Sequence, residues 1–134
     1  MKKRIGVWVD RRRAVIVTVG QGEEQVQVIA SPLEAVGTTK GRTQHGQHDI
    51  VPDAAQLNQE TIYLKKYYNE IVDQVKEADY LMLMGPGEAR VELRNALEQR
   101  SLGYKILEVK PAEKMTDREA MLAVRDYFAG HQLP

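Results

Sequence analysis

The sequence predicts an α/β fold, a mixed five-stranded sheet with helices on both faces. Three short segments rich in valine and isoleucine open the chain, and brief polar or glycine turns between them are typical of an antiparallel meander. Helical and strand-like segments then alternate, and a crossover through a helix joins parallel strands. With 134 residues, 43% hydrophobic and 28% charged, the chain has the size and composition of one globular domain at residues 1–134.

The N-terminal part contains the predicted meander, with strands expected at Arg4–Asp10, Ala14–Val19 and Gln25–Ile29. Glycine, threonine, glutamine and histidine then prevail from about residue 32 to residue 53. Because few apolar side chains there offset the entropy cost of ordering, the sequence predicts a long polar loop. We expect this loop to be exposed and mobile, or to reach a neighbouring chain.

The second part of the chain alternates helices and strands. The expected elements are an amphipathic helix at Ala54–Ala78, a strand at Tyr80–Met84, a helix at Glu88–Arg100, a strand at Tyr104–Val109 and a last helix that starts at the capping box of Thr116 and Glu119. Together with the meander, this is the order of elements in the ribonuclease-H-like architecture.

Composition excludes several classes of function. The chain has no cysteine, which excludes disulfides, thiolate zinc sites, iron–sulfur clusters and a cysteine nucleophile, and which favours a cytoplasmic location. The apolar run before Asp10 is too short for a signal peptide or a membrane span, so no membrane partner is expected. Residues 1–50 carry eight lysines and arginines against five acids, and this basic excess permits RNA binding at Arg11, Arg12 and Arg13.

Three stretches carry a resemblance to a known family: GVWVDRRRAVIVTV at 6–19, LMLMGPGEARVELRNALEQR at 81–100 and VKPAEKMTDREAMLAVRDYF at 109–128. They resemble the middle domain of the archaeal and eukaryotic peptide-chain release factors and of the ribosome-rescue protein Pelota. The resemblance is closer to single-domain bacterial relatives, which are described as translational machinery components or host-attachment-type proteins. It implies the same fold and a cytosolic protein that associates with RNA or the ribosome.

The resemblance also implies a candidate catalytic loop. In the release factors, a Gly-Gly-Gln loop between the third strand and the first helix places its glutamine where water attacks the peptidyl-tRNA ester. The corresponding loop here contains His45, Gly46 and Gln47, with His45 in place of the first glycine. Gln47 is then the catalytic candidate, with His45 and Gly46 as loop support, and Lys40 and Arg42 would contact phosphates.

Gly85, Pro86 and Gly87 follow a strand and precede a helix. Backbone amides at such a turn can hold a phosphate, so Gly85 and Gly87 are candidates for a phosphate-binding turn. The alternative is a purely structural turn in which Pro86 starts the helix.

Metal chemistry is a remote alternative. A metal-dependent nuclease would need carboxylates at one end of the sheet, with Asp10 as the first ligand and Glu60 or Glu70 on the first helix. The carboxyl end of the fourth strand offers only Glu88, so Asp10 is better explained as part of the hairpin turn. His45 and His48 lack a third ligand fixed by spacing, and we expect no metal and no cofactor.

Two aromatic residues lie off the apolar stripe of the first helix, Tyr63 and Tyr67, where they could stack on RNA bases or a partner protein. The leading hypothesis is an RNA- or ribosome-associated protein, with ribosome or tRNA as partner, that hydrolyses the peptidyl-tRNA ester in ribosome rescue. The alternative is a noncatalytic protein-interaction module, in which the fold is kept without the chemistry and the chain forms a homo-oligomer.

Overall fold

The computed structural model describes residues 2–20, 23–31 and 54–131. The strands are β1 (Arg4–Val9), β2 (Arg13–Gly20), β3 (Glu23–Ala30), β4 (Tyr80–Gly85) and β5 (Ile106–Pro111). The helices are α2 (Ala54–Val75), α3 (Ala89–Gln99), the 3₁₀ turn η1 (Gly103–Lys105) and α4 (Asp117–Ala129). The loop expected at about 32–53 lies outside the described residues.

The described strands form one sheet in the order β3-β2-β1-β4-β5. β1 pairs antiparallel with β2, and β2 pairs antiparallel with β3, as short turns between them require. β4 pairs parallel with β1 and with β5, because a helix separates each of these strands along the chain. The predicted mixed five-stranded sheet is therefore confirmed.

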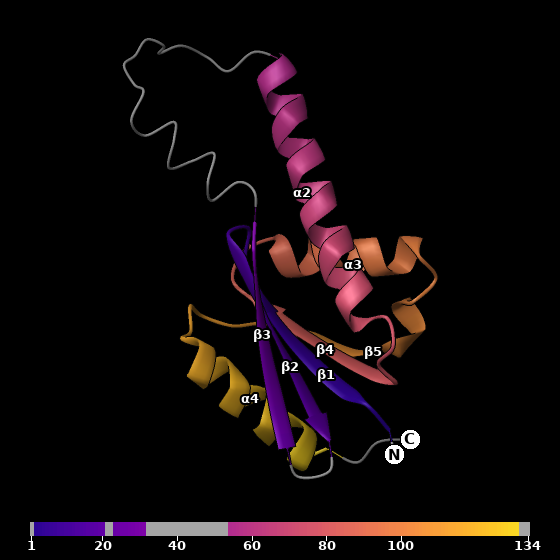
Figure 1. Ribbon diagram of the computed structural model, residues 1–134, viewed down its shortest axis with the longest axis vertical. Coiled ribbons are helices and arrows are strands. Elements are labelled where there is room, and N and C mark those ends of the chain that lie inside the picture. The colour runs from indigo at the N-terminus through magenta and orange to yellow at the C-terminus, as the bar shows by residue number, and fades with distance from the viewer. Residues whose placement is uncertain (1, 21–22, 32–53, 132–134) are drawn as a thin grey trace.

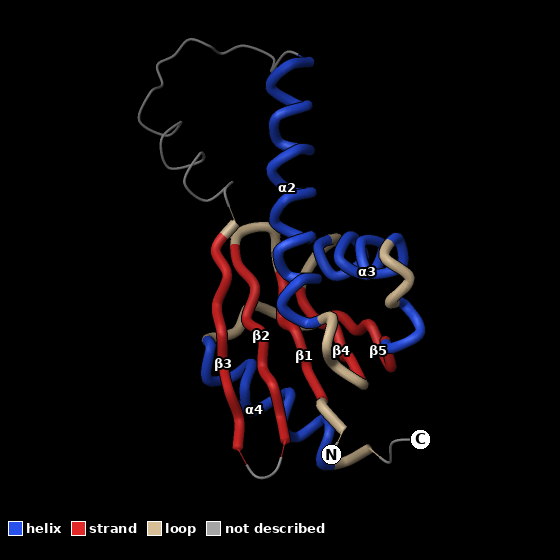
Figure 2. The backbone as a smooth tube through the Cα atoms, turned by 45° about the vertical axis from the view of Figure 1, so that its right-hand side comes forward, coloured by secondary structure: helices blue, strands red, loops and turns tan. Residues whose placement is uncertain are grey.

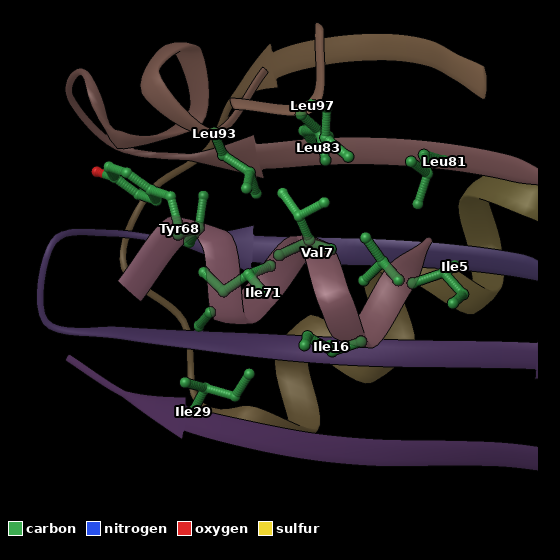
Figure 3. Close-up of a cluster of buried hydrophobic side chains, with 14 of the residues drawn as sticks. Ile5, Val7, Ile16, Ile29, Tyr68, Ile71, Leu81, Leu83, Leu93 and Leu97 are labelled. Atoms are coloured by element: carbon green, nitrogen blue, oxygen red, sulfur yellow. The ribbon is translucent and has the colours of Figure 1, made fainter. Parts of the chain in front are cut away.

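Helices cover both faces of the sheet (Figures 1 and 2). On one face, Ile5, Val7 and Leu83 pack against α2 and α3, and Figure 3 shows the side chains of this cluster between the strands and α2. On the other face, Trp8 and Met82 pack against α4. The alternation of side chains along each strand accounts for this division, because β1 and β4 are buried on both sides.

The long helix α2 is buried toward its C-terminal end. Ile71, Val72 and Val75 are fully buried against the sheet, whereas Ile62 is 52% exposed. The N-terminal part of α2 extends beyond the ends of the strands, as both views show (Figures 1 and 2). The expected amphipathic helix is therefore present, and its fully buried residues lie toward its C-terminal end.

Element ends differ from the predictions by a few residues. α2 ends at Val75, three residues before the expected end, and the amide of Ala78 then donates to the Val75 carbonyl. Tyr104 and Lys105 lie in η1, so the last strand starts at Ile106. Sequence periodicity places the centre of an element well and its ends poorly, because turns at the ends depend on single hydrogen bonds.

None of the described helices combines the length and the apolar character that crossing a membrane requires.

Candidate functional site

An open groove of about 450 Å³ lies between α2 and α3, on the face of the sheet that these helices cover. Amide and charged side chains surround two apolar ones, Leu64 and Ala96, in its lining. The other lining residues are Arg11, Glu60, Thr61, Lys65, Tyr68, Asn69, Glu92, Asn95 and Gln99. The groove therefore offers hydrogen-bond donors and acceptors beside a small apolar patch.

Three side chains from different elements form a hydrogen-bonded network at one end of this groove. Glu92 of α3 accepts from Arg11, which follows β1, through Nε at 3.2 Å to Oε1 and through a second bond from Nη2 to Oε2. Tyr68 of α2 donates its hydroxyl to Oε1 of Glu92 at 2.5 Å. Figure 3 shows Tyr68 extending from α2 with its hydroxyl at the margin of the apolar cluster. The network ties α2, α3 and the β1–β2 turn together.

The network also fixes the charges of its members. Partial burial alone would raise the pKa of Glu92, but the hydrogen bonds from Arg11 and Tyr68 lower it below the ordinary 4.5. Burial, followed by the hydrogen bond to Glu92 and its negative charge, raises the pKa of the Tyr68 hydroxyl. The hydrogen bond to Glu92 raises the pKa of Arg11. At neutral pH Glu92 and Arg11 therefore stay charged and Tyr68 stays neutral. These three groups position one another and are unsuited to proton transfer.

Hydrogen bonds within the β1–β2 turn and one from α2 hold this turn in place. Oδ1 of Asp10 accepts from the backbone amides of Arg12 and Arg13, both at 2.8 Å. The Tyr67 hydroxyl donates to the Asp10 carbonyl at 2.8 Å. Asp10 thus caps the hairpin, as the sequence indicated, and its carboxylate is engaged there.

Tyr67 corrects one prediction. Its side chain is fully buried and packs beside Tyr68, with ring centroids 5.2 Å apart, so it cannot stack on RNA bases. Tyr63, one turn earlier on α2, is partly exposed. The physical reason is that α2 contacts both the sheet and the turn, which widens its buried side beyond a single stripe.

The predicted basic cluster separates into three different environments. Arg11 pairs with Glu92, and its side chain is 53% exposed. Arg12 is exposed at the surface. Arg13 lies over the Trp8 ring, 4.8 Å from its centroid, and donates to Asp117 Oδ1 at 2.7 Å and to the Met115 carbonyl at 2.5 Å. Arg13 therefore holds the segment that leads into α4.

Gly85 has a structural reason to be glycine. A Cβ atom there would lie 2.0 Å from the Val9 carbonyl oxygen, and its φ of +150° disfavours other residues. Arg90 Nη1 donates to the carbonyls of Gly85 and Gly87, at 3.1 and 2.6 Å. α3 begins at Ala89 with Glu88 as its N-cap, so the expectation that Pro86 starts the helix is wrong. Phosphate binding at Gly85 and Gly87 stays a prediction.

The residues proposed for catalysis and its support, Gln47, His45 and Gly46, lie outside the described residues, as do the candidate phosphate contacts Lys40 and Arg42. Within the described ranges, no three histidine, cysteine or carboxylate side chains are grouped closely enough to hold a metal ion. Glu60 lines the groove and Glu70 is exposed.

Sequence reasoning missed Glu92 and Arg90, and it gave Tyr68 only a packing role. Glu92 meets Arg11 across 81 positions of the chain and Tyr68 across 24, so local spacing carried no information about either contact. Only the parallel pairing of β1 with β4 brings the start of α3 beside the β1–β2 turn.

Comparison with known proteins rests on the fold. No protein-family model matches the sequence, and no curated protein matches it either. The Pelota structures from Thermoplasma acidophilum and Archaeoglobus fulgidus both superpose with a TM-score of 0.58, at 19% and 12% identity, over 91% and 93% of this chain. The archaeal translation termination factor aRF1 superposes with a TM-score of 0.53, at 15% identity, over 95% of this chain.

The chain has the fold of one part of these proteins. It covers 31% of each Pelota chain and 39% of aRF1, which is well under half of their length. The expected resemblance to the release factors and Pelota is confirmed at the level of fold. At these identities the similarity shows the fold alone.

Proposed function

We propose that this protein is a cytoplasmic factor that associates with the ribosome or with tRNA and acts on the ester bond of peptidyl-tRNA. The observation that carries the proposal is the shared fold with Pelota and the termination factor aRF1 over more than nine-tenths of the chain. The segment that resembles the release-factor loop occupies the corresponding place in the order of elements, between β3 and α2.

The described residues next to this segment support RNA binding. The amide of Ser31, the last described residue before the segment, donates to the Arg12 carbonyl at 2.7 Å. Ser31 is thereby held beside the basic β1–β2 turn, where Arg11 and Arg12 are exposed. Exposed arginines contribute phosphate contacts without sequence preference, as binding to ribosomal RNA or tRNA requires.

Each loop residue has a separate role in the proposal. The Gln47 amide positions water against the ester without ionising, and Gly46 allows a close approach of the backbone. Lys40 and Arg42 contact phosphates. His45 stands where the release factors have a glycine, so replacing it with glycine is expected to favour catalysis. The resemblance to single-domain bacterial relatives belongs to the same proposal.

The test is single-turnover release of labelled peptide from ribosome-bound peptidyl-tRNA. Gln47→Ala should reduce release to the uncatalysed rate and leave RNA affinity nearly unchanged. Replacing Lys40 and Arg42 together by alanine should weaken RNA binding and flatten its salt dependence, because fewer counterions are released on binding. Wild-type protein that releases peptide no faster than the Gln47→Ala variant would refute the enzymatic role.

The groove between α2 and α3 favours a second candidate, a noncatalytic interaction module. Its amide side chains, next to the apolar Leu64 and Ala96, suit an extended polypeptide. Co-sedimentation with ribosomes at two salt concentrations separates the two. RNA-mediated binding falls steeply with salt, whereas binding of a protein through this groove depends on salt much less. Asn95→Arg in the groove should then abolish binding only if the groove is the contact.

A further inference from the structure

Strand β3 presents an open edge. It has eight residues, and within the part of the chain that the structure describes it pairs only with β2. The pairing runs in register over its full length, from Glu23 to Ala30, with no bulge. β3 contains no proline and no lysine, which are the usual means of protecting a strand edge.

One backbone hydrogen bond fixes which backbone groups of β3 face this open edge. The Ser31 amide donates to the Arg12 carbonyl at 2.7 Å, which makes these two residues a hydrogen-bonded pair of the ladder. Hydrogen-bonded pairs recur at every second residue of an antiparallel ladder. Ile29, Gln27 and Gln25 therefore point their backbone groups toward β2. The backbone N–H and C=O groups of the residues between them point outward: Glu24, Val26, Val28 and Ala30.

Two of the four residues whose backbone groups face the open edge are valines with exposed side chains. Val26 and Val28 are 44% and 46% exposed. In the register of the sheet they lie beside Val17 and Val15 of β2, on the face that α4 covers. The apolar surface under α4 thus continues onto β3, where these two valines are only partly covered.

We propose that β3 pairs antiparallel with β3 of a second copy of this chain, about a two-fold axis at Gln27. This register pairs Val26 of one copy with Val28 of the other, and Glu24 with Ala30. All four outward-pointing residues of each copy then form hydrogen bonds, and the exposed valines meet across the interface. The two sheets become one continuous sheet.

The charge pattern of β3 selects a second copy as the occupant. Its acids, Glu23 and Glu24, stand at one end, and the strand has no basic residue. At its other end, Ala30 lies beside Arg13 of the basic turn. Antiparallel pairing separates the acids of the two copies and places those of each copy at the basic end of the other. Parallel pairing would place the acids side by side.

Cross-linking tests the register directly, because the chain has no cysteine of its own. In the proposed dimer Gln27 faces its own counterpart in a non-hydrogen-bonded pair, with Cα atoms about 4.5 Å apart, which suits a disulfide. Gln25 faces Ile29 of the second copy and lies about 13 Å from its counterpart. Gln27→Cys should therefore form a covalent dimer with oxidised glutathione, and Gln25→Cys should not. Both glutamines are exposed on the same strand, so Gln25→Cys is a matched control for Gln27→Cys.

Sedimentation equilibrium of the full chain tests the association itself. Val26→Lys should raise the dimer dissociation constant at least about tenfold, because symmetry makes the substitution act at two valine pairs. Ile62→Lys places the same charge at another exposed apolar residue, on α2, and should leave the constant unchanged. Circular dichroism should show both variants folded.

Equal cross-linking by both cysteine variants would refute the register. A wild-type chain that remains monomeric in sedimentation, with no covalent dimer from Gln27→Cys, would refute the dimer and leave this edge to an extended segment of another protein.

Discussion

The two faces of the sheet are fastened to the same turn in different ways. On the α2 and α3 face, Arg11 meets Glu92 at the rim of an open groove, and its side chain is 53% exposed. On the α4 face, Arg13 lies over the buried Trp8 and its side chain is 25% exposed. One short turn therefore holds both helical layers. The half-exposed ion pair of Arg11 with Glu92 acts on one face, and Arg13, packed over the Trp8 ring, acts on the other. Arginines two positions apart thus have different tasks.

The largest effect is expected in the core of the α2 and α3 face. Leu93 is fully buried there, so Leu93→Ala should lower the free energy of unfolding by about 2–5 kcal/mol through lost burial and a residual cavity. Urea titration measures this loss. Ile62→Ala, at an exposed position on α2, should change stability by no more than about 0.5 kcal/mol. Equal losses for the two would mean that this face is not tightly packed.

A tight contact under α4 should give the next largest effect. A Cβ atom on Gly6 would lie 2.5 Å from Cγ2 of Val124, and the branched valine cannot turn away freely. Gly6→Ala should destabilise the protein by about 1–3 kcal/mol in urea titration. Gly20→Ala is the control, because a Cβ atom added there meets no atom of the described residues within 4 Å. Adding Val124→Ala to Gly6→Ala should recover part of the loss, and a strictly additive double variant would contradict the contact.

The two arginines of the turn provide the most direct test of the comparison. Arg13→Ala removes the contact with Trp8 and the bonds to Asp117 and Met115, and should cost about 1–2 kcal/mol. Arg11→Ala removes a more exposed pair and should cost about 0.5–1 kcal/mol. Added salt should reduce the Arg11 effect more than the Arg13 effect. The reverse order of losses in thermal unfolding would overturn the distinction.

The smallest effect concerns pH. Because the folded-state pKa of Glu92 is lowered, the network stabilises the protein above the unfolded pKa of this carboxyl, and the stabilisation is lost as pH falls through the folded pKa. Tyr68→Phe should cost about 1 kcal/mol at neutral pH, and this cost should shrink in acid.

Tyr67→Phe is the matched control for that experiment. It removes a hydroxyl bonded to the Asp10 carbonyl, which does not titrate. Its cost in urea titration should therefore be independent of pH over the acid range. A parallel pH dependence for the two tyrosine variants would show that Glu92 is not the titrating partner.

Local patterns in the sequence were sufficient for the fold. Valine- and isoleucine-rich runs separated by short turns indicated β1, β2 and β3, and the capping box of Thr116 and Glu119 marked the start of α4, where both of its hydrogen bonds are present. Such features depend on residues a few positions apart, so one sequence is enough to find them.

The candidate site was less accessible to sequence reasoning. The groove and its network depend on pairs far apart in the chain, such as Arg11 with Glu92, that only the finished sheet brings together. The sequence predicted that Tyr67 is accessible because the apolar stripe of the helix accounts for one contact surface. In the structure α2 contacts two surfaces, the sheet and the β1–β2 turn, and Tyr67 is buried between them. Gly85 was identified as a turn residue, but its contact with Val9 follows from the strand order.

Trp8 gives the molecule an optical reporter of its own. It is the only tryptophan of the chain, fully buried, and its indole Nε1 donates to the Glu113 carbonyl at 2.9 Å just before α4. Its fluorescence therefore follows the docking of α4 and the segment before it, because separation of this layer would expose the ring to water and shift its emission to longer wavelength. Events in the groove on the opposite face should leave that emission unchanged, so a single unlabelled sample distinguishes the opening of one layer from the other.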